Sequence, residues 1–242
     1  MSDQKNPNER RSFLLHAGLA GVASLTSLAL PAESSTSNIA LIAKPELTAS
    51  TYYSLGPEEA AFIEALVNIM CPADEFTPNG VDCGLAIYID RQLAGPYGQG
   101  DGRYQSAPFK QGKPELGLQL PLTPEQFCKA GIAAVNLACV RDHGATFDQL
   151  APAPAEAVLK EIEDGRMTAD RLPLASWFND IIYPLFNEAC FADPMYGGNR
   201  DAVFWKMIGY PGLPATHTID MVRYRGKPYP GAQHPKSISD FS

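Results

Sequence analysis

Residues 55–212 consist of helix-forming segments separated by proline and glycine, and this punctuation most constrains the fold. The clearest segment, 57–70, starts with proline and two glutamates, and its apolar residues recur three or four positions apart, as one helical face requires. Four further helices are predicted at residues 84–93, 124–142, 154–164 and 174–192. Small residues predict close helix packing at Ala133, Ala134 and Ala138. No stretch alternates apolar and polar residues for long enough to predict a strand. We therefore expect an all-α fold, a small irregular helical bundle.

The loops between these helices are expected to be long. The chain has 20 glycines and 21 prolines among 242 residues. Together these make roughly 17% of the chain, whereas glycine and proline make roughly 12% of average proteins. Residues 94–119 carry six of the glycines and no sustained period, so we expect a long Gly/Pro-rich surface loop there. Within residues 213–242, Tyr224, Tyr229 and the Pro-rich stretch from Lys227 to Pro235 are not expected to form a core of their own. We expect an extended C-terminal tail that is either disordered or ordered by lying on another protein.

The N-terminal 32 residues have the pattern of a bacterial export signal. A modestly apolar run follows two arginines, and it is too short and too interrupted to span a membrane stably. An ordinary secretion signal also carries basic residues, but the order Arg-Arg-x-Phe-Leu is the core of the twin-arginine motif. That core consists of Arg10, Arg11, Phe13 and Leu14. We therefore predict a signal at 1–32, a mobile arm at 33–54 and a helical domain at 55–212, exported already folded by the twin-arginine translocase.

The charge balance excludes one class of partner. The chain has 19 Lys and Arg against 27 Asp and Glu, a formal net charge of -8. A nucleic-acid binder normally presents a basic stripe to the phosphates. We expect no nucleic-acid partner.

Residues 193–212 form a dense series of local signals, Asp-Pro-Met-Tyr-Gly-Gly-Asn-Arg-Asp-Ala-Val-Phe-Trp-Lys-Met-Ile-Gly-Tyr-Pro-Gly. The first part predicts a turn, and Asn199 can cap the helix that follows. Gly209 stands where a helix C-terminal glycine belongs, and Pro211 prevents continuation. Trp205 is expected either in the core, which we favour, or as an anchor for a partner.

The same segment resembles the hallmark of the gluconate 2-dehydrogenase subunit 3 family. The resemblance extends upstream to Met70-Cys71-Pro72 and to Asp82-Cys83-Gly84, and covers roughly residues 55–225. The motif residues that we expect to characterise the family or contact a partner are Pro194, Tyr196, Gly197, Gly198, Asn199, Arg200, Asp201, Trp205, Gly209, Tyr210, Pro211 and Gly212.

The resemblance implies a non-catalytic small (gamma) subunit of a membrane-bound dehydrogenase. In such complexes an FAD-containing large subunit oxidises D-gluconate to 2-dehydro-D-gluconate, or another sugar or polyol. A multihaem cytochrome c subunit then passes the electrons to quinone. The small subunit is expected to hold no cofactor, to escort and stabilise the flavoprotein during export, and to lie in the periplasm at the membrane through its partners.

The residues themselves predict no catalytic or metal site. No second histidine or cysteine follows His143, His217 or His234 by three or four residues, and no Cys-x-x-Cys occurs. Neither a dinucleotide-binding Gly-x-Gly-x-x-Gly nor a nucleophile-elbow Gly-x-Ser-x-Gly is present. Two alternatives stay open: a free-standing exported enzyme or sugar-binding module, and an electron relay through Trp205 or nearby tyrosines.

Five cysteines in an exported chain predict at least one disulfide. Cys71 and Cys83 flank the loop between the first two helices, and bridging them would stabilise the fold by about 3 kcal/mol. Cys128 and Cys139 lie about 16 Å apart on one predicted helix and cannot bridge each other. One of these two could meet Cys190, a pairing that the sequence leaves open, and the odd count leaves at least one thiol.

Overall fold

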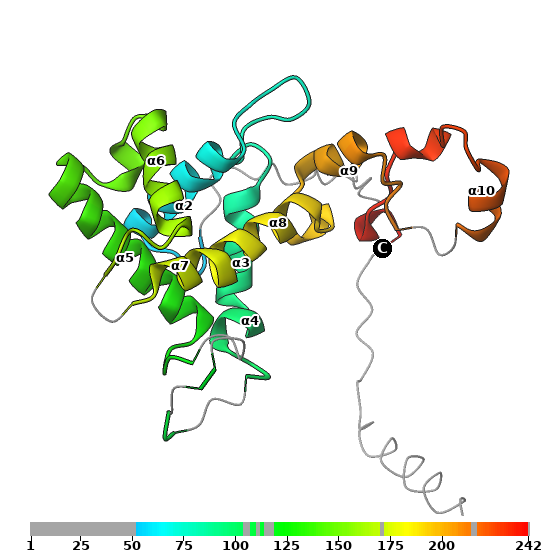
Figure 1. Cartoon of the computed structure of the whole chain (residues 1–242). Coiled ribbons are helices and arrows are strands. Elements are labelled where there is room, and N and C mark those ends of the chain that lie inside the picture. Colours follow the sequence, from blue (N-terminus) through cyan, green and yellow to red (C-terminus); the bar gives the residue numbers. More distant parts are fainter. Residues whose placement is uncertain are drawn as a thin grey trace, which may run out of the picture. The chain divides into compact units, whose positions relative to one another are not determined.

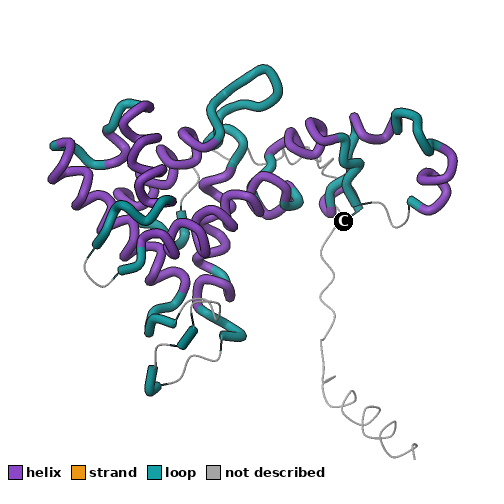
Figure 2. The backbone as a smooth tube through the Cα atoms, viewed as in Figure 1, coloured by secondary structure: helices purple, strands orange, loops and turns teal. Residues whose placement is uncertain are grey.

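The computed structural model describes residues 52–103, 107–109, 112–113, 119–169, 172–213 and 217–241 (Figure 1). All regular structure within these ranges is helical, without a β-strand (Figure 2), so the all-α prediction is confirmed. The predicted export signal, 1–32, lies outside the described residues, and so does most of the arm at 33–54.

Four predicted helices appear with start signals close to those expected. They are α2 (Pro57–Met70), α3 (Leu85–Ala94), α5 (Pro124–His143) and α6 (Pro152–Glu163). In α5 the hydroxyl of Thr123 accepts the Gln126 N–H at 3.2 Å, and the Gln126 side chain accepts the Thr123 N–H at 3.0 Å. This capping box satisfies two backbone donors that the helix itself leaves free.

The predicted long helix at 174–192 is continuous but changes its winding before Pro184. It consists of α7 (Leu174–Trp177), a π-helical turn η3 (Phe178–Ile182) and α8 (Tyr183–Phe191). Proline has no N–H to donate to the preceding turn. The wider π turn accommodates this loss, and α8 begins with Pro184 in its first turn.

The core lies where α2, α5 and α7 meet. The Phe62 ring is 4.6 Å from the Phe147 ring and 6.1 Å from the Trp177 ring, measured between centroids. All three side chains are fully buried. The Trp177 indole N–H donates to the Cys128 carbonyl at 3.0 Å, which satisfies the only polar group of that side chain. Phe147 belongs to the short helix η2 (Phe147–Gln149).

Residues 52–54, which we expected in the mobile arm, are bound to the helical body. The buried carboxylate of Asp90 on α3 accepts the backbone N–H groups of Tyr53, Ser54 and Leu55 at 2.8 to 2.9 Å. The Lys129 ammonium donates to the Ser54 carbonyl at 2.7 Å. The folded unit therefore includes the chain from Tyr52 onward.

Two segments expected to lack regular structure contain short helices. The loop at 94–119 starts with α4 (Pro96–Gln99). The tail at 213–242 contains α10 (Thr218–Arg223), η6 (Pro230–Gln233) and η7 (Ile238–Asp240). Across the described ranges, no helix has the length and apolar character needed to cross a bilayer.

Candidate functional site

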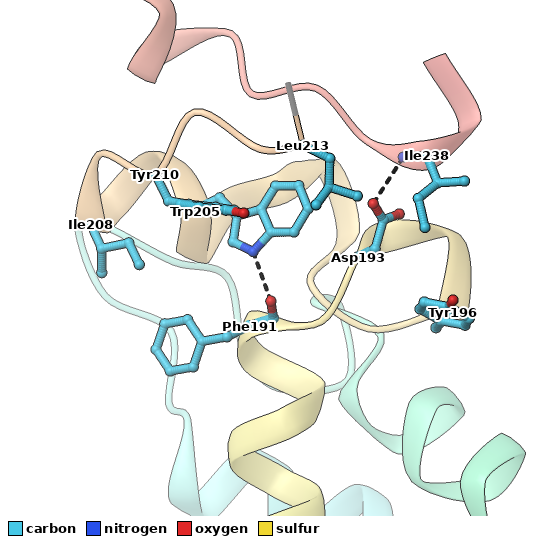
Figure 3. A pocket seen from close by; sticks show the side chains of 8 residues that line it. All are labelled: Phe191, Asp193, Tyr196, Trp205, Ile208, Tyr210, Leu213 and Ile238. Carbon is cyan, nitrogen blue, oxygen red and sulfur yellow. Dashed lines mark hydrogen bonds between the residues drawn. The ribbon is translucent and has the colours of Figure 1, made fainter. Parts of the chain in front are cut away.

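The predicted motif forms the junction between the helical bundle and the C-terminal segment. Its elements are η4 (Pro194–Tyr196), η5 (Arg200–Ala202) and α9 (Val203–Ile208), which follow α8 directly. Trp205 is 3% exposed, and its indole N–H donates to the Phe191 carbonyl at the end of α8 at 2.8 Å (Figure 3). The Tyr210 ring meets the Trp205 ring edge-on at 5.1 Å. The expectation that Trp205 is a core residue is therefore confirmed.

Asn199 links the two ends of this junction. Its side chain is fully buried, its amide donates to the Ala192 carbonyl at 3.1 Å, and its amide oxygen accepts the Phe204 N–H at 3.0 Å. The Asn199 side chain thus caps the first turn of α9, as predicted. It does so from five residues before Phe204 and not from the position that adjoins the helix. Gly209 ends α9 in the left-handed conformation, also as predicted.

Two glycines let the motif approach the start of α3. A Cβ on Gly84 would lie 2.2 Å from the Gly197 carbonyl oxygen, and a Cβ on Gly197 would lie 2.6 Å from the Arg91 guanidinium. The Arg200 N–H donates to the Cys83 carbonyl at 3.0 Å. The two parts of the sequence that carry the resemblance, 82–84 and 193–212, are thus in direct contact.

The backbone after this contact is strained. Asn199, Asp201 and Ala202 have φ angles of 44°, 57° and 53°, in the left-handed region that favours glycine. The side chains of Arg200 and Asp201 are exposed. Gly198 leaves no room for a side chain either, because its Cβ would lie 2.4 Å from the Ala189 carbonyl oxygen.

Asp193 fastens the C-terminal end of the chain to this junction. Its carboxylate is 7% exposed and accepts the Ser237 hydroxyl at 2.9 Å, the Ile238 N–H at 2.9 Å and the Met195 N–H at 3.0 Å (Figure 3). Our sequence reasoning missed this role. The Asp-Pro pair indicated only a turn, and no pattern links it to a serine 44 residues later.

A groove of about 480 Å³ opens beside these contacts. Its lining residues come from α8, the motif and the C-terminal segment: Phe191, Asp193, Tyr196, Trp205, Ile208, Tyr210, Leu213 and Ile238 (Figure 3). Trp205 lies at the bottom, and six of the others are apolar or aromatic side chains that are 37% to 56% exposed. Such a groove suits an apolar anchor from another molecule.

The motif side chains divide between the groove and the structure that supports it. Tyr196, Trp205 and Tyr210 line the groove. Pro194 opens η4. Pro211 and Gly212 pair with the backbone of Lys236: the Lys236 N–H donates to the Pro211 carbonyl at 3.0 Å, and Gly212 and Lys236 form an isolated bridge.

The predicted disulfide between Cys71 and Cys83 is wrong for this structure. All five cysteines are buried free thiols. The thiols of Cys71 and Cys83 both donate to the Pro78 carbonyl, at Sγ–O distances of 3.8 and 3.4 Å. The loop between the two helices thus satisfies both thiols without a covalent bond.

Cys190 lies near this pair of thiols. Burial, followed by the neighbouring Cys71 and Cys83, raises the pKa of the Cys190 thiol to about 12. Burial also raises the pKa of Cys83 to about 11. Thiols held neutral in this way are poor nucleophiles and poor metal ligands at neutral pH.

The groove is lined mainly by apolar and aromatic side chains. Its one carboxylate, Asp193, is already held by three donors, and the other seven lining residues offer two phenol hydroxyls and an indole but no nucleophile–base pair. Among the residues that the structure describes, no three His, Cys, Asp or Glu side chains are grouped closely enough to hold a metal ion.

Comparison with known proteins identifies the family. The model of the family described as gluconate 2-dehydrogenase subunit 3 matches residues 57–212, which is more than half of the chain and runs from the start of α2 to the end of the motif. Neither the curated proteins nor the solved structures contain a significant match. The span of the family match shows that this chain belongs to the gluconate 2-dehydrogenase subunit 3 family.

Proposed function

We propose that the chain is the non-catalytic small subunit of a membrane-associated, FAD- and cytochrome c-containing gluconate 2-dehydrogenase. The observation that carries the proposal is the family match over the whole helical body. The site geometry agrees with it, because the motif side chains maintain a junction and an apolar groove and supply no reactive pair. In this proposal the FAD and the haem c belong to partner subunits.

The large FAD-containing subunit would depend on this chain for export and stability. The sequence Arg-Arg-x-Phe-Leu at residues 10–14 supports recognition by the twin-arginine translocase, which carries folded proteins. A flavoprotein without a signal of its own would cross the membrane bound to this chain. Both would then lie in the periplasm, held at the membrane by the multihaem cytochrome c subunit.

The decisive experiment is purification from membranes through a tag at the C-terminus of this chain. The eluate is assayed for flavin absorbance, haem absorbance and gluconate-dependent dye reduction. We expect all three to be recovered together. If the tagged chain is recovered without flavin, the subunit role is wrong.

A second experiment tests export. Replacing Arg10 and Arg11 by lysine keeps the charge but removes the motif, so we expect both this chain and the flavoprotein to remain in the cytoplasm. Lys5→Gln, outside the motif, is the matched control and should leave export unchanged. Normal export of the flavoprotein in the double-lysine variant would show that this chain does not escort it.

A free-standing sugar-binding module is the alternative. Sugar recognition needs several hydrogen-bonding groups converging on one site, and the groove offers two phenol hydroxyls beside an already occupied carboxylate. Titration of the purified chain with gluconate and glucose, followed by Trp fluorescence, distinguishes the two. Saturable binding by the chain alone would favour the alternative.

A further inference from the structure

The helix α10 exposes a row of aliphatic side chains. Ile219, Met221 and Val222 are 71%, 67% and 78% exposed, although α10 is an ordered helix and makes no extensive contact with another helix of the described chain (Figure 1). Exposed aliphatic side chains are common singly but not in a row. This face is therefore an unpartnered apolar surface.

The segment that carries α10 is a closed loop. The Leu213 N–H donates to the Lys236 carbonyl at 2.8 Å, and the Lys236 N–H donates to the Pro211 carbonyl at 3.0 Å, so both ends of the loop meet. We call residues 213–236 the C-terminal loop. Asp193, through Ser237 and Ile238, holds these ends against the bundle.

The other face of α10 is held by aromatic contacts inside the loop. The Tyr229 ring meets the Tyr224 ring edge-on at 5.2 Å and the His217 ring at 5.9 Å, and its hydroxyl donates to Asp220 at 3.3 Å. These contacts occupy the polar side of the helix. They orient the backbone of α10 so that its aliphatic side chains face outward, and a helix that is already formed lowers the entropy cost of binding.

The C-terminal loop also differs from the rest of the molecule in charge. Residues 213–236 contain four Lys and Arg against one Asp, whereas residues 52–212 contain eleven Lys and Arg against twenty-one Asp and Glu. Arg223, Arg225 and Lys227 follow the aliphatic row directly and are exposed. None of them belongs to the ion pairs found among the described residues.

We propose that the C-terminal loop is a docking element whose aliphatic row enters an apolar groove with an acidic rim on the flavoprotein subunit. The proposal rests on the proposed function for the existence of that partner. The charge pattern argues for the acidic rim, because the exposed basic patch beside the aliphatic row is complementary to an acidic surface and would direct the contact there. The loop lies beyond residue 212, where the family match ends, so it would give this chain a partner specificity of its own.

A protein partner fits these observations better than a lipid surface. Helices that lie in a membrane interface present a large apolar face, rich in Trp, Phe and Leu, against a strongly basic one. α10 has six residues and exposes three aliphatic side chains without an aromatic one. Three such side chains suit a groove that surrounds them and excludes water.

The test compares two sets of substitutions in the full-length tagged chain, purified with its complex from membranes. The first, Ile219→Ser/Met221→Ser/Val222→Ser, removes the aliphatic row; the second, Arg223→Gln/Arg225→Gln/Lys227→Gln, removes the basic patch. Controls are Leu137→Ser on α5, which is 74% exposed, and Lys160→Gln/Arg166→Gln at exposed positions. Circular dichroism melting checks that each variant is folded.

We expect the serine variant to recover at least tenfold less gluconate-oxidising flavoprotein per tagged chain than the wild type. We expect the glutamine variant to bind the flavoprotein more weakly than the wild type at 50 mM salt, and we expect its binding to depend less on the salt concentration. Both controls should retain the flavoprotein. Wild-type recovery by the serine variant would overturn the docking element and leave the proposed function standing, whereas absence of flavoprotein from the wild-type eluate would overturn both.

Two further measurements identify a different occupant. In the first, the wild-type chain binds phosphatidylglycerol vesicles, and the serine variant loses this binding but keeps the flavoprotein. That result would assign the loop to the membrane. In the second, the purified chain sediments as a dimer, and the serine variant loses the dimer but keeps the flavoprotein. That result would assign the loop to a second copy of this chain. Either result overturns the proposal.

Discussion

Close packing between α5 and α7 depends on one missing side chain. A Cβ on Gly131, in the middle of α5, would lie 2.0 Å from the indole nitrogen of Trp177. The sequence pointed to Ala133, Ala134 and Ala138 as the positions of close packing. Ala138 is buried, but Ala133 is exposed. The close approach therefore occurs at a glycine, two positions before the first of the three expected alanines.

Gly131→Ala tests this packing at the residue scale. Alanine normally stabilises a helix interior by about 1 kcal/mol relative to glycine. Here we expect the opposite, a loss of about 1–3 kcal/mol from overpacking against Trp177. Urea unfolding followed by Trp fluorescence measures it, with Ala133→Gly as the control for helix propensity. A more stable Gly131→Ala variant would contradict the close approach.

Asp90 is a second residue on which a segment depends. Three backbone N–H groups converge on its buried carboxylate. Asp90→Ala leaves all three without their acceptor, and we expect a loss of about 2–4 kcal/mol in the free energy of unfolding. Asp90→Asn keeps an oxygen acceptor for two of the donors and should lose less. Equal stability of the alanine variant and the wild type would show that residues 53–55 contribute nothing.

At the scale of elements, side-chain hydrogen bonds near the end of α8 hold the short helices that follow it. The Trp205 indole bonds the end of α8 to α9, Asn199 bonds the residue after α8 to the first turn of α9, and Asp193 bonds the start of η4 to η7. Short helices such as α9 and η7 are marginal by themselves. These side-chain bonds, together with burial of the indole, determine where they lie.

Asp193→Ala should release the C-terminal segment while the bundle stays folded. We expect amide hydrogen exchange to rise at least tenfold across residues 230–241 and to stay unchanged in α2 and α5, because local opening follows the local contacts. Hydrogen exchange with mass spectrometry measures both regions in one sample. Ser237→Ala, which removes one of the three bonds to Asp193, should have a smaller effect. Unchanged exchange at 230–241 would show that Asp193 does not hold this segment.

At the scale of the whole molecule, five buried thiols couple folding to alkaline pH. Burial raises the pKa of Cys139 to about 11 and that of Cys128 to about 12, from an ordinary value of 9.0. Cys83 and Cys190 are shifted in the same direction. In the unfolded chain these thiols ionise at their ordinary pKa. The free energy of unfolding therefore begins to fall once the pH rises above about 9.

We therefore expect full stability below pH 9 and a progressive loss between pH 9 and 12, of at most about 1.4 kcal/mol per thiol for each pH unit. Thermal melts from pH 7 to 11 measure it, and Cys128→Ala should reduce the slope. A thiol reagent at pH 8 should label none of the five cysteines quickly in the folded protein and all five after unfolding. Three labelled thiols after unfolding would mean that two cysteines had been oxidised.

The sequence by itself determined the all-α class, most helix limits and the family, because caps, proline and glycine act on their own neighbours in the chain. It also predicted the cap by Asn199 and the burial of Trp205. Only the tertiary structure decided the free thiols of Cys71 and Cys83, the anchoring of residues 53–55 on Asp90 and the bond from Asp193 to Ser237. In each case the residues concerned lie between 12 and 44 positions apart in the sequence. No local pattern records such a meeting, because it depends on how the helices pack and on which buried polar groups then need a partner.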